Sequence, residues 1–183
     1  MKVCVVGTAR VGKSSLIRRY VYNSFDEKYL FTIGASVSKT LVEIEMPGST
    51  ERTKVTLMLW DIMGEKNFLD LIKEAYFKHA VGIIAVADLT RPETFGDTGT
   101  WIGAVREVAG DDIPVVLVGN KFDLVEFRLL DWSPLAEASA KFSAPFLPTS
   151  AKEGRNVETA FSTIARLALV NELRAGKTAT APA

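Results

Sequence analysis

The sequence has few of the features that mark secreted, membrane-spanning or nucleic-acid-coating proteins. Among 183 residues there is one cysteine, Cys4, so no disulfide can form within the chain, which suits a reducing compartment. The longest apolar stretches, residues 81–87 and 113–119, are far shorter than the roughly 20 residues of a membrane span. Twenty-two Lys and Arg balance twenty-two Asp and Glu, and this zero net charge excludes a strongly basic field for nucleic acid.

The two ends of the printed chain also lack targeting signals. The first residues, Met1-Lys2-Val3, run directly into strand-like sequence without the apolar core of a signal peptide. The last residues, 177–183, contain no cysteine that could be prenylated. We therefore expect a cytoplasmic, monomeric protein with no direct membrane anchor in this chain and no nucleic-acid partner.

Length and composition predict one folded domain. A chain of 20.0 kDa with 48% hydrophobic and 24% charged residues can bury a large core without disulfides or a structural metal. No repeat or linker interrupts it. We expect a domain over residues 1–175 and a disordered tail over residues 176–183.

Strand-like and helix-like segments alternate along the chain, which predicts an α/β domain with a mostly parallel sheet. The two segments on either side of the turn at residues 47–50 look like an antiparallel hairpin, and Ser133 followed by Pro134 fits a helix N-cap and first turn. Predicted strands span residues 2–7, 35–46, 53–60, 81–87, 114–119 and 146–149; predicted helices span residues 13–22, 68–79, 93–109, 133–142 and 157–174.

One motif between the first strand and the first helix predicts phosphate binding. Its glycines allow successive backbone N–H groups to point at phosphate oxygens, and the following helix adds its partly positive N-terminus. Lys13 would neutralise the β- and γ-phosphates, and Ser14 would offer its hydroxyl to Mg²⁺. The motif, GxxxxGK[ST], reads Gly7-Thr8-Ala9-Arg10-Val11-Gly12-Lys13-Ser14.

A second motif selects the base. Asn120-Lys121-Phe122-Asp123 follows a buried strand at its carboxyl end, where ligands bind in open α/β sheets. The Asp123 carboxylate can accept two hydrogen bonds from guanine, whereas adenine would leave it buried and unpaired. Ser150-Ala151-Lys152 could cover the other side of the base. An ATP-dependent enzyme would require Asp123 to be irrelevant.

Together these motifs resemble a small GTPase of the Ras superfamily, closest to the Rab branch. The resemblance extends from Lys2 to about Arg174 and rests on five motifs in family order. They are the phosphate loop, Tyr29-Leu30-Phe31-Thr32-Ile33-Gly34, Trp60-Asp61-Ile62-Met63-Gly64, Asn120-Lys121-Phe122-Asp123 and Thr149-Ser150-Ala151-Lys152. It implies a P-loop NTPase three-layer sandwich with a six-stranded, mostly parallel sheet and one antiparallel edge strand.

The resemblance also implies roles for individual residues. Ser14, Thr32 and, through water, Asp61 would hold Mg²⁺, and the Gly64 N–H would contact the γ-phosphate. Phe25 would lie edge-on against the guanine; the alternative is a half-buried loop aromatic. The residues expected to bind GTP or GDP are Ala9, Arg10, Val11, Gly12, Lys13, Ser14, Ser15, Phe25, Thr32, Gly64, Asn120, Lys121, Asp123, Ser150, Ala151 and Lys152.

Two residues depart from the family pattern. Glu65 stands where the family has the glutamine that orients the attacking water, and the sequence contains no glutamine. An ionised carboxylate accepts a hydrogen bond from water but cannot donate one, and it adds negative charge beside the γ-phosphate. We expect Glu65 to slow hydrolysis; the alternatives are that it holds the attacking water or is a solvated bystander. Arg10 replaces a residue that is commonly glycine or another small residue. It could reach phosphate charge, as an arginine finger does, or face solvent at the loop tip.

The expected function is a guanine-nucleotide switch with slow GTP hydrolysis. The candidate catalytic residues are Lys13, Thr32, Gly64, Glu65 and Arg10. Two segments, a first switch segment at about residues 24–36 and a second at about residues 61–72, would signal to effector, exchange-factor and GTPase-activating proteins. The alternative is a GTP- or GDP-bound scaffold with negligible turnover.

Two further features have structural explanations. The single histidine, His79, fits a turn or surface position, and the apolar stripe from Val157 to Ala168 has the spacing of a helix face packed in the core.

Overall fold

The computed structural model describes residues 1–26, 32–45, 52–126 and 131–179. Within these ranges, the strands are β1 (Lys2–Val6), β2 (Ala35–Glu45), β3 (Arg52–Ile62), β4 (Gly82–Asp88), β5 (Val115–Asn120) and β6 (Phe146–Pro148). The α-helices are α1 (Lys13–Tyr22), α2 (Leu69–Phe77), α3 (Glu93–Ala109), α4 (Ser133–Phe142) and α5 (Val157–Ala179), and the 3₁₀ helices are η1 (Lys66–Phe68) and η2 (Phe122–Leu124).

The strands form one sheet in the order β2-β3-β1-β4-β5-β6. The edge strand β2 runs antiparallel to β3, with Ala35 opposite Ile62 and Glu45 opposite Arg52. Every other neighbouring pair is parallel. The predicted six-stranded, mostly parallel sheet with one antiparallel edge strand is therefore confirmed.

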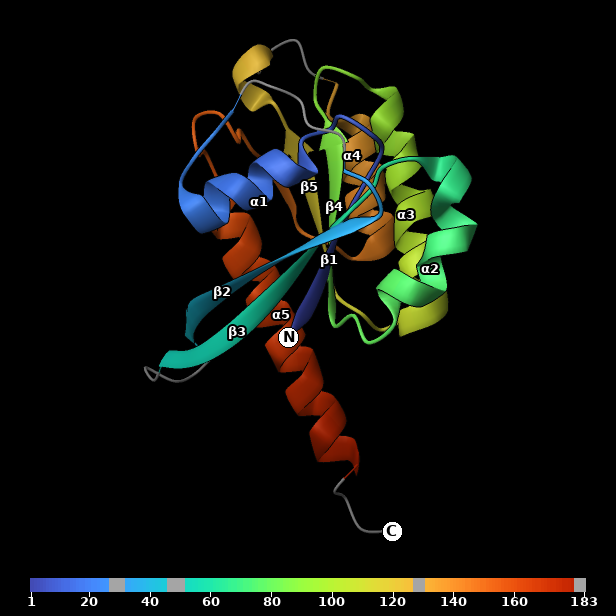
Figure 1. The fold of residues 1–183 in the computed structure, drawn as a ribbon, viewed down its shortest axis with the longest axis vertical. Helices are drawn as coiled ribbons and strands as arrows, with labels where there is room; N and C mark the ends of the chain where they lie inside the picture. Colours follow the sequence, from blue (N-terminus) through green and yellow to red (C-terminus); the bar gives the residue numbers. More distant parts are fainter. Residues whose placement is uncertain (27–31, 46–51, 127–130, 180–183) are drawn as a thin grey trace.

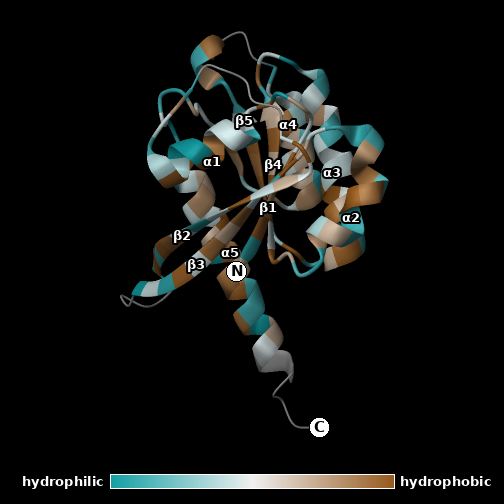
Figure 2. Cartoon of the chain, in the orientation of Figure 1, coloured by the Kyte–Doolittle hydropathy of each residue, from teal (hydrophilic) through white to brown (hydrophobic). Residues whose placement is uncertain are grey.

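Helices cover both faces of the sheet and complete the three-layer sandwich (Figure 1). Alternate residues of β1 enter different layers: Val3 and Val5 pack with α1 and α5, whereas Cys4 and Val6 pack with α2 and α3. Burial on both faces makes the central strands β4 and β5 apolar up to their last residues, Asp88 and Asn120, as Figure 2 shows by their brown colour. Packing in this core holds the parallel strands in place, so that their carboxyl ends lie together along one edge of the sheet.

Three helices differ from the sequence prediction at their ends. Helix α2 spans Leu69–Phe77, where residues 68–79 were predicted. Helix α4 begins at Ser133, so the N-cap is Trp132 and not Ser133, and the Asp131 carboxylate accepts the Ser133 N–H at 2.9 Å. The sequence rule found a residue type that often caps helices, but this residue lies inside the helix, and the acidic residue two positions earlier accepts its N–H. Helix α5 continues past Arg174 to Ala179. A division into domain and tail at residue 176 stays a prediction.

Candidate functional site

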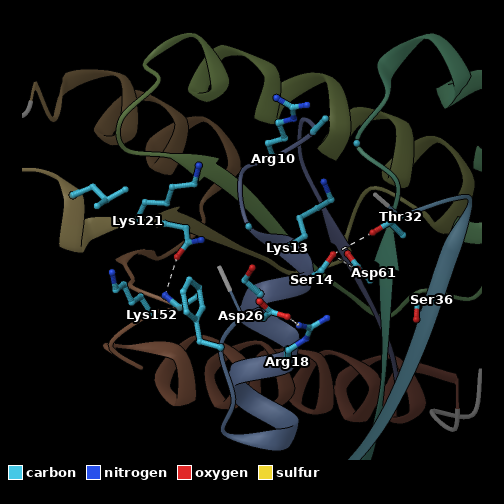
Figure 3. Close-up of a pocket in the computed structure, with 18 of the residues that line it drawn as sticks. Arg10, Lys13, Ser14, Arg18, Asp26, Thr32, Ser36, Asp61, Lys121 and Lys152 are labelled. Atoms are coloured by element: carbon cyan, nitrogen blue, oxygen red, sulfur yellow. Dashed lines mark hydrogen bonds and ion pairs between the residues drawn. The ribbon is translucent and has the colours of Figure 1, made fainter. Parts of the chain in front are cut away.

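A cleft of about 930 Å³ opens at the carboxyl edge of the sheet. It extends from the loop after β1 to the loops after β5 and β6, and the chain after α1 forms one wall (Figure 3). Fourteen of the sixteen residues predicted to bind nucleotide line it. They are Ala9, Arg10, Gly12, Lys13, Ser14, Ser15, Phe25, Thr32, Gly64, Asn120, Lys121, Asp123, Ala151 and Lys152.

The other two predicted residues, Val11 and Ser150, lie just beneath the cleft. The Val11 side chain is fully buried in the core under the phosphate loop. Ser150 is also fully buried, and its hydroxyl donates a hydrogen bond to Asp123 Oδ1 at 2.6 Å. Ser150 therefore supports a lining carboxylate in this structure.

The turn from the phosphate loop into α1 depends on a residue without a side chain. Gly12 has φ of +99°, in the region that L-residues rarely adopt, and a Cβ there would lie 2.2 Å from Asn120 Nδ2. The same Asn120 amide donates to the Val11 carbonyl at 3.0 Å. Gly12 thus lets the base motif approach and hold the phosphate loop.

Lys13 lies at the centre of this loop. Its Nζ donates to the carbonyl oxygens of Gly7, at 2.8 Å, and Thr8, at 3.1 Å. Burial lowers the Lys13 pKa to about 8, against the opposing influence of the Asp61 and Glu65 carboxylates. A buried ammonium of this kind can be paired with phosphate oxygens.

The predicted metal ligands meet at one corner of the cleft. Ser14 Oγ donates to Asp61 Oδ2 at 2.5 Å and lies 3.2 Å from Thr32 Oγ1. Asp61 is 6% exposed, and its other oxygen, Oδ1, is buried with no hydrogen-bond partner among the described residues. Burial raises the Asp61 pKa, while the hydrogen bond from Ser14 and the charge of Lys13 oppose this rise.

This donor set fits a hard, oxygen-seeking cation. Mg²⁺ in proteins typically uses one or two protein oxygens together with substrate phosphates and water. Two hydroxyls and a buried carboxylate oxygen without a partner supply such a partial shell. No group of three or more His, Cys, Asp or Glu residues suited to a metal occurs in the part of the chain that the structure describes. A site completed by phosphate and water is therefore the arrangement that these residues can support.

At the far end of the cleft, Asn120 joins three loops. Besides Val11, its side chain contacts Thr149 Oγ1 at 3.3 Å and accepts the Ala151 N–H at 3.2 Å. Together with the hydrogen bond from Ser150 to Asp123, these contacts leave the half-buried Asp123 carboxylate facing the cleft. The residues predicted to select the base are therefore brought together.

The sequence did not predict a network that lies behind the base motif. Lys121 Nζ is 2.6 Å from Asp88 Oδ2, and Arg91 Nε is 3.0 Å from the same oxygen. Arg91 also donates from Nη2 to the carbonyl of Ala9 at 3.0 Å. This network connects the base motif, the end of β4 and the tip of the phosphate loop.

Further residues missed by sequence reasoning are Arg18, Asp26, Ile33, Ser36 and Leu124, which line the cleft. Arg18 lies one helical turn after Ser14 and pairs with Asp26 at 3.7 Å (Figure 3). Its i+4 spacing from Ser14 on α1 was a signal that could have found it. Arg19, outside the lining, donates to the carbonyls of Ala151 at 2.8 Å and Lys152 at 2.6 Å and so supports the base loop.

The two predicted switch segments contact each other and the phosphate loop. The Met63 N–H donates to the Gly34 carbonyl at 2.9 Å, and the Ala9 N–H donates to the Gly64 carbonyl at 3.0 Å. A Cβ at Gly64 would lie 2.4 Å from the Ala9 nitrogen, so this approach requires glycine. Within the first segment, Thr32 belongs to the described residues, whereas Tyr29, Leu30 and Phe31 lie outside them.

The two residues that depart from the family pattern are both at the phosphate end. Glu65 is half-buried and follows Gly64 directly, close enough for its charge to influence Lys13. Arg10 is exposed at the loop tip with φ of +66°, a left-handed conformation that explains why glycine is common there. Phe25 lines the cleft and is also half-buried against the core, so its contact with guanine stays a prediction.

No helix within the described residues is both long and apolar enough to cross a membrane.

Comparisons with known proteins agree with this geometry. A sequence model of the Ras family matches residues 2–170. The chain is 37% identical to the "GTP-binding protein YPTM1" of Zea mays over 178 residues, which are 97% of this chain and 81% of the relative. It is 36% identical to the "Ras-related protein RIC1" of Oryza sativa subsp. japonica, over 90% of this chain and 78% of the relative. The chain is 35% identical to the "GTP-binding protein ypt1" of Schizosaccharomyces pombe, again over 90% of this chain and 78% of the relative. The chain therefore belongs to the Ras family of small GTPases, in its Rab-like branch, whose members bind GTP and GDP with Mg²⁺ and hydrolyse GTP.

Proposed function

We propose that this protein is a guanine-nucleotide switch whose nucleotide lies along the cleft, with its phosphates at Lys13 and its base at Asp123. The observation that carries the proposal is that one cleft contains a glycine-turned phosphate loop, an orphaned carboxylate oxygen on Asp61 and a base-facing carboxylate on Asp123. A nucleoside triphosphate matches this arrangement: its phosphates would meet the positive charge and the metal ligands, and its base would meet the hydrogen-bond acceptor. The chain supplies every one of these residues itself, which supports a monomeric switch.

The base end would select guanine by hydrogen bonding. Asp123, held by Ser150, would accept two hydrogen bonds from the guanine edge, and the loop at Ala151 and Lys152 would cover the base. Lys121 would lie along the base with its ammonium anchored on Asp88. Adenine offers no matching donors, so it would leave the Asp123 carboxylate desolvated and unpaired.

The phosphate end would hold the charged part of the nucleotide. Lys13 can exchange its two carbonyl partners, Gly7 and Thr8, for phosphate oxygens. Ser14, Thr32 and Asp61 would hold Mg²⁺, with Asp61 acting through water. When bound, Mg²⁺ would neutralise charge that develops on the phosphates.

Hydrolysis breaks the bond between the γ-phosphorus and the bridging oxygen as water attacks in line. The water proton leaves with the phosphate product. Glu65 can accept a hydrogen bond from that water, but it is half-buried, and its negative charge adds to the charge of the phosphoryl oxygens. We expect the repulsion to dominate, so that intrinsic hydrolysis is slow and a partner protein accelerates it. The comparisons do not favour a scaffold without turnover.

The switch segments would report the nucleotide state to effector, exchange-factor and GTPase-activating proteins. Gly34 and Met63 connect residues 24–36 with residues 61–72 through one backbone hydrogen bond, so a change at one segment affects the other. Apolar side chains on these segments and on β2 and β3 are exposed, including Ile33, Val37, Phe68 and Leu71. We propose that partners contact this surface in the cytoplasm, where the free Cys4 thiol would stay reduced.

The direct test is to identify the nucleotide that co-purifies with the full chain and to follow its turnover. Acid extraction followed by chromatography should release GDP or GTP and no adenine nucleotide. Addition of GTP with Mg²⁺ should then produce GDP and phosphate over many minutes. Co-purifying ATP, or retention of GTP for days with Mg²⁺ present, would contradict the proposal.

A further inference from the structure

A polar cluster outside the lining of the cleft joins the phosphate loop, the second switch segment and α3. Its centre is Asp97, on the second turn of α3. Asp97 Oδ2 accepts a hydrogen bond from Thr8 Oγ1 at 2.8 Å, and Asp97 Oδ1 pairs with Lys66 Nζ. Thr8 belongs to the phosphate loop, and Lys66 directly follows Glu65 at the start of η1. One carboxylate thus connects two segments that are far apart in the sequence.

The surroundings of Asp97 strengthen both contacts. Its side chain is 22% exposed, and that of Lys66 is 43% exposed, so water screens the pair less than it screens a pair at the open surface. Burial by itself would raise the pKa of Asp97, but the hydrogen bonds from Lys66 and Thr8 outweigh burial and lower it. The carboxylate is therefore charged at neutral pH. A charged acceptor with two donors holds both of them more firmly than a neutral one would.

Two neighbouring contacts fix the same rim of the phosphate loop. The Ala9 N–H donates to the Gly64 carbonyl at 3.0 Å, and the Ala9 carbonyl accepts from Arg91 at 3.0 Å. Thr8 and Ala9 are therefore supported by α3 and its preceding loop on one side and by the second switch segment on the other. After release of Lys66, the hydrogen bond from Ala9 to Gly64 would still join that segment to the phosphate loop.

A second ion pair joins α2 to α3 and, among the described residues, has no contact with the phosphate loop. Lys73 on α2 lies 2.7 Å from Glu107 on α3 and 3.4 Å from Asp70. Like the pair of Lys66 and Asp97, it ties the second switch region or its continuation to α3. Its carboxylate partners contact neither Thr8 nor Ala9 in the hydrogen bonds and ion pairs of the described residues. The ion pair of Lys73 and Glu107 can therefore serve as a control for the ion pair of Lys66 and Asp97. Breaking the control pair would affect the stability of the fold without acting directly on the phosphate loop.

We propose that Asp97 is a positioning residue for nucleotide retention, which holds Lys66 and Thr8 together so that displacement of the second switch segment loosens the phosphate loop. The inference rests on the proposed guanine-nucleotide site. A loop held in its binding geometry before the ligand arrives loses less entropy on binding, and the bound state is longer-lived for that reason. The contacts of Asp97 with Lys66 and with Thr8 act in series. Loss of either contact should therefore loosen the phosphate loop as much as loss of both.

The test measures how fast the full chain, loaded with a fluorescent GDP analogue and Mg²⁺, releases it into excess unlabelled GDP. Lys66→Met and Thr8→Val should each raise the release rate about fivefold, and the double variant should be no faster than the faster single variant. Asp97→Asn retains an oxygen for Thr8 but loses the charge that holds Lys66, so it should match Lys66→Met. Lys66→Arg preserves the ion pair and should stay within twofold of the parent.

Lys73→Met is the control for a general loss of stability at the interface of α2 and α3. It should leave the release rate within twofold of the parent. An effect of Lys73→Met as large as that of Lys66→Met, or multiplication of the two single effects in the double variant, would overturn the role of Asp97. Identical release from the parent and Lys66→Met would overturn it as well. A parent chain that binds no labelled GDP would instead overturn the proposed function, and this inference with it.

Discussion

The Lys121 ammonium lies 2.6 Å from Oδ2 of Asp88, a carboxylate from which solvent is wholly excluded. Burial by itself would raise the pKa of Asp88, but hydrogen bonds from Lys121, Thr90 and Arg91 outweigh burial and lower it. The residue that the sequence motif assigns to the base is thus anchored by a carboxylate at the end of β4.

The first prediction follows from that lowered pKa. A group whose pKa is lower in the folded than in the unfolded state stabilises the fold above its unfolded value and loses this effect as pH falls through its folded value. Asp88→Asn should therefore reduce the free energy of unfolding at pH 7 by about 3 kcal/mol, because Lys121 and Arg91 lose their charged partner. The difference between parent and variant should shrink below about pH 4. Urea unfolding of the nucleotide-free chain between pH 7 and pH 3 measures it, and a difference that stays constant over this range would contradict it.

The second prediction concerns base selection by Asp123. The parent should favour GTP over ATP by about 10⁴-fold, because the wrong base leaves buried polar groups unpaired. Asp123→Ala should lose at least about 100-fold of this preference while the fold persists. Titration calorimetry with both nucleotides measures the ratio. Glu137→Ala, which removes an exposed carboxylate on α4, is the matched control and should leave the ratio unchanged. Equal affinity of the parent for ATP and GTP would refute the guanine assignment.

The third prediction concerns the metal corner. Removing Mg²⁺ with a chelator should speed GDP release by at least about tenfold, since the charge on the β-phosphate would lose a partner. Ser14→Ala should release GDP quickly with or without chelator. Thr32→Val should weaken binding of a non-hydrolysable GTP analogue far more than binding of GDP. Release from the parent that is indifferent to chelator would show that the metal site is misplaced.

The fourth prediction concerns the sign of the Glu65 effect on hydrolysis. Glu65→Ala should hydrolyse GTP faster than the parent in single-turnover measurements. Glu65→Gln should be faster still, by about tenfold over the parent, which corresponds to about 1.4 kcal/mol of barrier. A large loss of rate in Glu65→Ala would show instead that the carboxylate orients the water.

Arg10→Ala completes that experiment. Arginine and alanine share a Cβ, so both face the same backbone cost at φ of +66°, and the comparison isolates the guanidinium. We expect a rate within twofold of the parent. A loss of tenfold or more would place a catalytic role at the tip of the phosphate loop.

The sequence predicted the sheet, the order of its elements and most of the cleft lining, because these depend on local periodicity and on motifs with fixed spacing. It did not predict which residues support those motifs. Asp88, Arg91 and Arg19 are ordinary residues in their local context, and their contacts with Lys121, Ala9 and Ala151 join segments distant in the chain. The N-cap at Ser133 was wrong for a similar reason, because the local rule could not weigh Asp131 against Ser133. Helix α5 extends beyond its predicted end into residues whose composition gave no helical stripe.

The Asn120 side chain has a consequence for how the protein folds. Its amide reaches Val11, 109 positions away, and Ala151, 31 positions away, so the site closes only after strands β1, β4, β5 and β6 have all paired. Contacts of such long range form late, since the chain must first lose the entropy of the intervening loops. A chain in which these strands are unpaired would lack the complete cleft. Guanine nucleotide in the cell would then favour completed molecules over incomplete ones by mass action, and its supply would set how many finished copies survive degradation.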